Sequence, residues 1–312
     1  MTQPTVWPEL PYAQWSDTQA TLQLWTQIVG KIRLAQTPWL NHSWHVALYV
    51  TSRGLTTSPI PHGDRSFEIH FDFLIHQLVI TTNDGAIRNF ALEPRTVADF
   101  YAAVMKALNE LALPVHINEL PCEIPNAIRF NTDTVHGAYD RDYAQRFWQA
   151  LVQADRLFKQ FRTGFLGKAS PVHFFWGSFD LAVTRFSGRR APTFTGKAPG
   201  LDARVMQEAY SHEVSSAGFW PGGNGVDASF YSYAYPTPAD FSKQPVKPEA
   251  ATFNTTLGEF LLPYESVRRS ADPDAALLDF LESTYQAAAN TAQWDREALE
   301  CPLGRSGAPR QL

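Results

Sequence analysis

The chain has 312 residues, of which 44% are hydrophobic and 18% charged, a composition typical of a globular protein rather than a disordered or fibrous one. It has 26 Lys and Arg against 31 Asp and Glu, so the net charge is −5 at pH 7, the wrong sign for a protein that neutralises phosphates. We therefore expect no nucleic-acid partner. Only Cys122 and Cys301 are present, which excludes a disulfide framework and a cysteine-based zinc site and favours a reducing cytoplasm.

The chain shows no sign of export or of membrane insertion. Its first ten residues lack the basic and apolar regions of a signal peptide, and no apolar run approaches the roughly 20 residues of a membrane span. We expect no membrane partner. The length exceeds that of a usual single core, so we predict two lobes, at residues 1–130 and 131–300, followed by a frayed tail at 301–312.

In the first lobe, hydrophobic spacing predicts a helix over residues 17–35, with Ser16 as its cap. A second helix over 96–111 begins with Thr96 and Asp99 in capping-box register. Asn83-Asp84-Gly85 predicts a tight hairpin, because Gly readily adopts positive φ. Residues rich in β-branched and aromatic side chains predict strands at 44–52, 67–75, 78–82, 87–92 and 114–117.

In the second lobe, a long apolar stripe predicts a helix over residues 141–162. A further helix begins with Asp272 as its N-cap and Pro273 in its first position, and runs to about residue 293. Strands are expected at 172–186, 210–217, 229–235 and 259–264.

Both lobes share the order of long helix, antiparallel strands and closing helix. The sequence therefore predicts an α+β protein with two lobes, each an antiparallel sheet covered by long helices. The common order suggests an internal duplication, to which a local match adds: Val50-Thr51 precedes Arg53-Gly54, and Val183-Thr184 precedes Arg185 and Gly188. Two such lobes also arise without duplication.

No nucleotide-binding, metalloprotease or serine-hydrolase signature is present, so chemistry must be sought on the strands. In strand 67–75, alternation places Glu68, His70 and Asp72 on one face. Such an array binds a divalent metal or moves protons. The alternative is the solvated face of a half-buried strand.

In residues 173–185, alternation places Trp176 and Asp180 on one face and His173 and Arg185 on the other. An unpaired Asp180 among aromatic side chains would have a raised pKa, as a general acid or base requires. Alternatively, Asp180 pairs with an arginine and is structural.

Ser211-His212-Glu213 resembles a hydrolase triad, but adjacent strand residues point to opposite faces, so we reject a local triad. His212 and Glu213 could instead join residues of other strands, and His173 would pair with His212 if their strands are neighbours. The alternative is a histidine with a purely structural role.

Aromatic side chains follow in residues 218–235. Trp220 lies in a glycine-rich turn, and Tyr231 and Tyr233 share one face of the next strand, so these rings and Trp176 could wall a cleft. Alternatively, they fill an ordinary core. The loop at 187–203, which contains Arg189, Arg190 and Lys197, is a lid, an anion-binding segment or a solvated basic loop.

Five stretches of the chain resemble a family of uncharacterised bacterial proteins, a domain of unknown function. The resemblance spans nearly the whole chain and implies no reaction, cofactor or catalytic residue. The stretches are IVGKIRLA at 28–35, LYVTSRGLTTSPIPHG at 48–63, SPVHFFWGSFDLAVTRFSGR at 170–189, EAYSHEVSSAGFWPG at 208–222 and FYSYAYP at 230–236.

Three hypotheses follow. The first is an enzyme acting on a small molecule, with acid–base groups, an arginine for an anionic group, and aromatic walls. The acid–base groups are Asp180, His173, His212 and Glu213. The arginine is Arg185, and the aromatic walls are Trp176, Trp220, Tyr231 and Tyr233. The second is a non-catalytic protein that binds a small ligand or assembles with copies of itself. The third, a metal-dependent protein with ligands from His70, Asp72, His173, His212 and Glu213, is not preferred. The sequence leaves the cofactor unknown.

Overall fold

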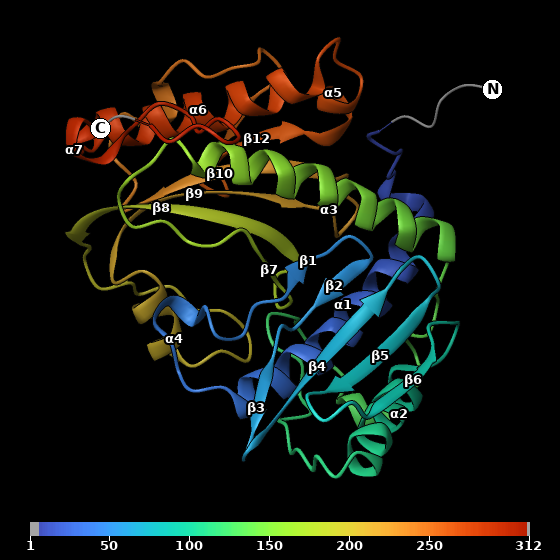
Figure 1. Ribbon diagram of the computed structural model, residues 1–312. Helices are drawn as coiled ribbons and strands as arrows, with labels where there is room; N and C mark the ends of the chain where they lie inside the picture. Colours follow the sequence, from blue (N-terminus) through green and yellow to red (C-terminus); the bar gives the residue numbers. More distant parts are fainter. Residues whose placement is uncertain (1–5, 311–312) are drawn as a thin grey trace.

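The computed structural model describes residues 6–310, and this part of the chain forms seven α-helices and two six-stranded antiparallel sheets (Figure 1). The prediction of an α+β protein with two lobes is confirmed. In the first sheet the strand order is β1-β2-β4-β5-β6, with β3 also paired to β4. The first lobe comprises α1 (Tyr12–Gln36), η1 (Asn41–Ser43), β1 (Tyr49–Val50), β2 (Gly54–Thr56), β3 (Ile60–His62), β4 (Arg65–Asp72), β5 (Gln77–Thr82), β6 (Ile87–Ala91), α2 (Val97–Glu110) and η2 (Phe130–Thr132).

The second sheet has the order β11-β12-β10-β9-β8-β7, with every pair antiparallel. The second lobe comprises α3 (Arg141–Arg162), β7 (His173–Phe175), β8 (Asp180–Arg190), α4 (Ala203–Ala209), β9 (His212–Trp220), β10 (Ser229–Tyr235), η3 (Phe241–Lys243), β11 (Thr252–Asn254), β12 (Glu259–Pro263), α5 (Tyr264–Arg268), α6 (Pro273–Thr291) and α7 (Arg296–Leu299).

The first helix begins earlier than the sequence predicts. α1 starts at Tyr12, so Ser16 lies inside the helix and the predicted cap is wrong. The N-cap residue is Pro11, which offers no side-chain hydrogen bond, and the Tyr12 backbone N–H donates to Asp227 Oδ1 at 2.9 Å. A carboxylate far along the chain therefore satisfies one of the free N–H groups at this helix end, which the local sequence does not reveal.

Three predicted strands differ from the structure. Residues 44–52 contain only the two-residue β1, because His42 and Ser43 both have φ of +58° and form a tight turn before it. Residues 114–117 form no strand. The single strand predicted over 172–186 is a hairpin of β7 and β8, joined by a turn in which Phe179 has φ of +63°.

The second sheet is covered on one face by α3 and α6, while α4 lies on its opposite side (Figure 1). Alternation along β8 points Leu181, Val183 and Arg185 towards the helices, and all three are buried. The other face of the sheet carries Asp180 and Thr184, and this face forms the candidate site.

The two lobes are joined along β1 and β7. Leu48 and Phe174 exchange backbone hydrogen bonds of 2.9 and 2.7 Å, and Trp176 Nε1 donates to the Val46 carbonyl at 2.8 Å. The local match offered as a sign of duplication is not at equivalent positions, since Val50 ends β1 whereas Val183 lies inside β8.

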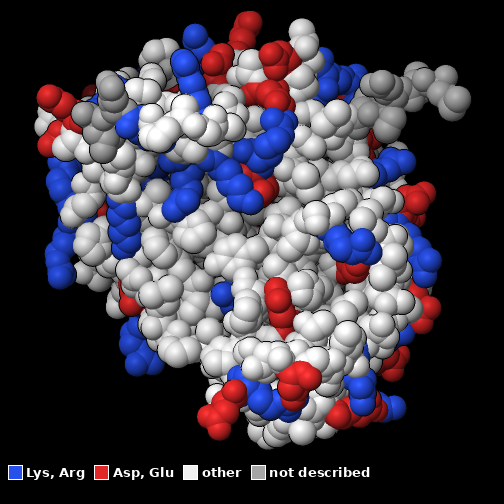
Figure 2. Space-filling view, viewed as in Figure 1, with Lys and Arg blue, Asp and Glu red and all other residues white. Residues whose placement is uncertain are grey.

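The face of the molecule seen in Figure 2 carries acidic and basic side chains mainly towards its edges, and its centre is largely uncharged. At the end of the described chain, Arg310 Nη1 donates to the Thr163 carbonyl at 2.7 Å. None of the helices in residues 6–310 is both long enough and apolar enough to cross a membrane.

Candidate functional site

A cavity of about 790 Å³ lies on the open face of the second sheet. Strands β7 to β10 and β12 form its floor, while η1, α4 and the segment around Cys122 complete its walls. It therefore draws on both lobes. Its volume lies within the range of pockets that enclose a small organic ligand. Its polar and aromatic lining includes His42, Ser43, Glu123, His173, Trp176, Ser178, Asp180, Thr184, Tyr210, Ser216, Trp220, Tyr231, Tyr233 and Glu259.

Tyrosine rings form one wall of the cavity. Tyr231 and Tyr233 are two residues apart on β10, so both point from the same face, and their rings lie nearly parallel with centroids 6.2 Å apart. The Tyr233 hydroxyl lies 3.1 Å from that of Tyr210, whose ring stacks on Phe194. These contacts hold the rings in defined orientations.

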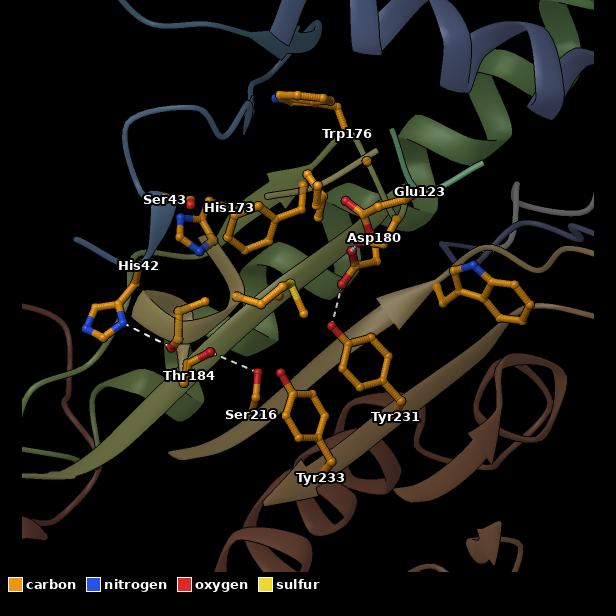
Figure 3. Close-up of a pocket in the computed structure, with 18 of the residues that line it drawn as sticks. His42, Ser43, Glu123, His173, Trp176, Asp180, Thr184, Ser216, Tyr231 and Tyr233 are labelled. Carbon is orange, nitrogen blue, oxygen red and sulfur yellow. Dashed lines mark hydrogen bonds between the residues drawn. The ribbon is translucent and has the colours of Figure 1, made fainter. Parts of the chain in front are cut away.

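Asp180 lies at the start of β8, and only 6% of it is exposed. One carboxylate oxygen accepts a hydrogen bond from the Ser178 hydroxyl, and the other accepts one from the Tyr231 hydroxyl, which Figure 3 shows. Burial raises the pKa of Asp180, and these two hydrogen bonds oppose that effect. Asp180 is consequently a buried acidic group held in one position.

Glu123 and Glu259 bring two more carboxyl groups to the cavity. Glu123 extends from the segment before η2 and points towards Asp180 (Figure 3), and Glu259 begins β12. Neither carboxyl group has a hydrogen-bond or ion-pair partner in the described part of the chain. Burial, together with the nearby Asp180, raises the pKa of both Glu123 and Glu259 to about 7.

Histidines occupy the other end of the cavity. His173 is only 1% exposed, and its Nδ1 has no hydrogen-bond partner within residues 6–310. Burial, with smaller effects of Arg33 and Arg162, lowers the pKa of His173 to about 3, so the ring is neutral at physiological pH. His42 Nε2 lies 2.6 Å from the Lys168 ammonium.

The family model for DUF5996, a family of unknown function, matches residues 7–301. The chain belongs to this family. A search of curated proteins and a search of solved structures each found no match to it. As a DUF5996 protein, it inherits no assigned reaction, and its function must be argued from the cavity.

Six of the predicted site residues of this DUF5996 protein line the cavity together: His173, Trp176, Asp180, Trp220, Tyr231 and Tyr233. The sequence placed His173 and Asp180 on opposite faces, which is wrong. Because the turn between β7 and β8 reverses the chain, His173 lies opposite Ala182 and shares the face of Asp180.

Arg185 does not reach the cavity. It points into the core under α3, where its guanidinium lies 3.5 Å from the centre of the Phe161 ring and only 1% of the residue is exposed. Its Nη2 contacts Glu282 at 3.5 Å. The geometry assigns Arg185 a packing role rather than contact with a ligand in the cavity.

His212 and Glu213 also lie outside the cavity lining. The Glu213 carboxylate accepts hydrogen bonds from Ser187 Oγ and Arg189 Nε, both at 2.8 Å, and His212 Nδ1 lies 3.0 Å from Ser211 Oγ. β8 separates β7 from β9, so His173 and His212 are not on neighbouring strands.

Sequence reasoning missed Glu123, Glu259, Tyr210 and His42. Glu123 lies in an irregular segment and has φ of +61°, and Glu259 was read only as the first residue of a strand. Gly177 gives an indirect sign of the position of Glu123. A Cβ at Gly177 would lie 1.9 Å from Glu123 Oε1, so the glycine leaves room for this carboxylate. That signal can be read only once the fold is known.

The described residues contain no group of three or more His, Cys, Asp or Glu side chains arranged to hold a metal ion. On β4, Glu68 and His70 contact each other at 3.4 Å. Asp72 instead pairs with Arg53 and accepts the backbone N–H groups of Leu74 and Ile75. Asp72 therefore anchors the turn after β4, and the three side chains do not form the metal-binding array that was considered as one hypothesis.

Proposed function

We propose that the protein is an enzyme that binds a small, largely apolar organic molecule in this cavity and transfers protons with Glu123 and Glu259. One observation carries the proposal: two carboxyl groups without partners among the described residues face the same cavity, and burial and Asp180 raise the pKa of each to about 7. Such groups are part ionised and part protonated at neutral pH, as acid–base catalysis requires.

The simplest reaction of this kind moves a proton within the substrate. The ionised carboxylate takes a proton from one substrate atom, and the protonated carboxyl group returns a proton to another atom. Atoms and charges balance without a further reactant. Asp180, held by Ser178 and Tyr231, acts as a positioning residue, because its negative charge helps to raise the pKa of both glutamates.

The second candidate is a non-catalytic binding protein. The observation in its favour is that both oxygens of Asp180 already accept hydrogen bonds, while Tyr210 and Tyr233 contact each other. A pre-organised wall of this kind binds a ligand without any chemical step.

Cavity occupancy is tested with two tryptophan variants of α4. Val205 lines the cavity, whereas Gln207 is exposed on the same helix. Compounds from a small-molecule panel that raise the melting temperature of the wild type and of Gln207→Trp, but not of Val205→Trp, bind in the cavity. An equal effect on all three proteins would show that binding occurs elsewhere.

Catalysis is then tested by incubating each cavity-binding compound with the protein in D₂O. Proton transfer exchanges deuterium into the compound, which mass spectrometry detects. We expect Glu123→Gln and Glu259→Gln to lose most of the exchange, by roughly 100-fold, when each variant is measured at a compound concentration that saturates it. Compounds that bind without exchange in the wild type would contradict the enzyme proposal and favour the binding protein.

A further inference from the structure

The charged side chains among the described lining residues of the cavity are all acidic. The lining carries the carboxyl groups of Glu123, Asp180 and Glu259, and no lysine or arginine of the described chain is among the lining residues. Elsewhere in residues 6–310, carboxylates such as Asp72 and Glu213 are paired with arginines. The cavity therefore lacks the usual cationic partner of a buried carboxylate.

We propose that the natural ligand of the cavity is an organic cation, an amine or a quaternary ammonium compound with an apolar body. This inference rests on the cavity of the proposed function and names the class of molecule that occupies it.

The two free glutamates are the first argument. Removing a carboxylate from water is costly unless an opposite charge or hydrogen-bond donors replace the solvent. Glu123 and Glu259 have neither among the described residues, and Asp180 adds further negative charge beside them. A bound cation would supply the missing partner, whereas an anion would be repelled by all three groups.

The aromatic walls are the second argument. The rings of Tyr231 and Tyr233 face the same space as the carboxyl groups, and Trp220 also lines it. The pKa of each tyrosine is raised well above its usual value, chiefly by burial, so the rings are neutral phenols. Neutral aromatic faces attract cations, and attract them more strongly when water is excluded.

His173 is the third, independent argument that a ligand belongs here. This side chain lines the cavity, is almost completely buried, and its Nδ1 has no hydrogen-bond partner within the described residues. Buried polar groups are usually hydrogen-bonded. A neutral imidazole at the end of the cavity away from Glu123 would bind a polar group on the far side of the ligand (Figure 3).

Three probes of similar size and different charge test the proposal: 2-phenylethylamine, 2-phenylethanol and 3-phenylpropionate. Isothermal titration calorimetry at pH 8, above the pKa of both glutamates, measures their affinities. We expect the amine to bind at least about tenfold more tightly than the alcohol and the carboxylate to bind more weakly than either. Affinity for the alcohol equal to that for the amine, preference for the carboxylate, or no binding of the amine would each overturn the proposal.

Variants locate the effect. Glu123→Gln and Glu259→Gln should each weaken amine binding by roughly tenfold and leave alcohol binding unchanged, whereas the exposed Glu249→Gln should leave both unchanged. An unaltered preference for the amine in the double variant would overturn the proposal. Amine binding without deuterium exchange would leave this inference standing and contradict catalysis. Deuterium exchange on a neutral or anionic compound that binds more tightly than the amine would support catalysis and contradict this inference.

Discussion

The phenol of Tyr231 lies directly over Gly218, its register partner on the neighbouring strand. A Cβ at Gly218 would come within 2.3 Å of both Cζ and the hydroxyl oxygen of Tyr231. The absence of a side chain at Gly218 therefore allows Tyr231 to lie flat on the sheet and to reach Asp180.

Gly218→Ala should displace Tyr231 and break its hydrogen bond to Asp180. We expect the free energy of unfolding to fall by about 1–3 kcal/mol, because the methyl group overpacks the site and the buried Asp180 loses a donor. Urea unfolding measures the loss. The Gly→Ala change repeated in a Tyr231→Ala background should be neutral or slightly stabilising. An equal loss in both backgrounds would show that Tyr231 is not the cause.

Gly177→Ala should displace the carboxyl group of Glu123 with little effect on the stability of the fold. Its Cβ would lie 1.9 Å from Glu123 Oε1, which is the far end of a flexible side chain, so stability should change by less than about 1 kcal/mol. The displaced carboxyl group would leave the vicinity of Asp180, and its pKa should fall from about 7 towards the usual value of 4.5. NMR titration of the Glu123 carboxyl carbon measures this pKa, and an unchanged value would contradict the prediction.

Regular helices were predictable because their signals are local. The stripe that includes Phe147, Leu151 and Phe158 has helical spacing, and α3 occupies residues 141–162 as predicted. The side chain of Thr96 accepts the Asp99 N–H at α2, and that of Asp272 accepts the Ala275 N–H at α6. These caps lie within three residues of the groups that they bind, so spacing alone identifies them.

The β7–β8 hairpin was not predictable from alternation. Residues 173–186 mix apolar and polar side chains on both expected faces, and the turn inside them places Phe179, a bulky residue that rarely has positive φ, in the left-handed region. The backbone N–H of Phe179 donates to the Phe175 carbonyl at 2.8 Å to close the turn. One missed turn reversed the expected relation between His173 and Asp180.

The aromatic part of the site was predictable, and the acidic part was not. Tyr231 and Tyr233 are two residues apart on one strand, so their common face follows from the sequence. Glu123 and Glu259 are 136 positions apart in the chain and line the same cavity only because of strand order and of the path of an irregular segment. No local pattern contains that information.

Gly30→Ala should destabilise the junction between the lobes. In a solvent-exposed helix this change usually stabilises by about 1 kcal/mol. Here a Cβ would lie 2.1 Å from Nε1 of Trp176, a buried indole that is held by its hydrogen bond to Val46. We expect a loss of at least about 2 kcal/mol in urea unfolding. A gain in stability would show that the indole moves freely.

The stability of the protein should decrease between pH 4.5 and pH 7, in part because of Glu259. In the folded state Glu259 retains its proton up to about pH 7, whereas in the unfolded state it loses it near its usual pKa of 4.5. The folded state therefore binds more protons in this window, and the free energy of unfolding falls as pH rises, then levels off above pH 7.

Glu259→Gln removes this contribution. The difference between the two pKa values, at 1.36 kcal/mol per unit, limits the effect to about 3 kcal/mol at pH 8. We expect the variant to be more stable than the wild type at pH 8 and to show no such gain at pH 4, as measured by urea unfolding. His173, with a pKa lowered to about 3, acts in the opposite direction below its usual pKa of 6.5, so only the difference between variant and wild type is diagnostic. The same gain in the exposed Glu249→Gln would show that net charge, and not the cavity, is responsible.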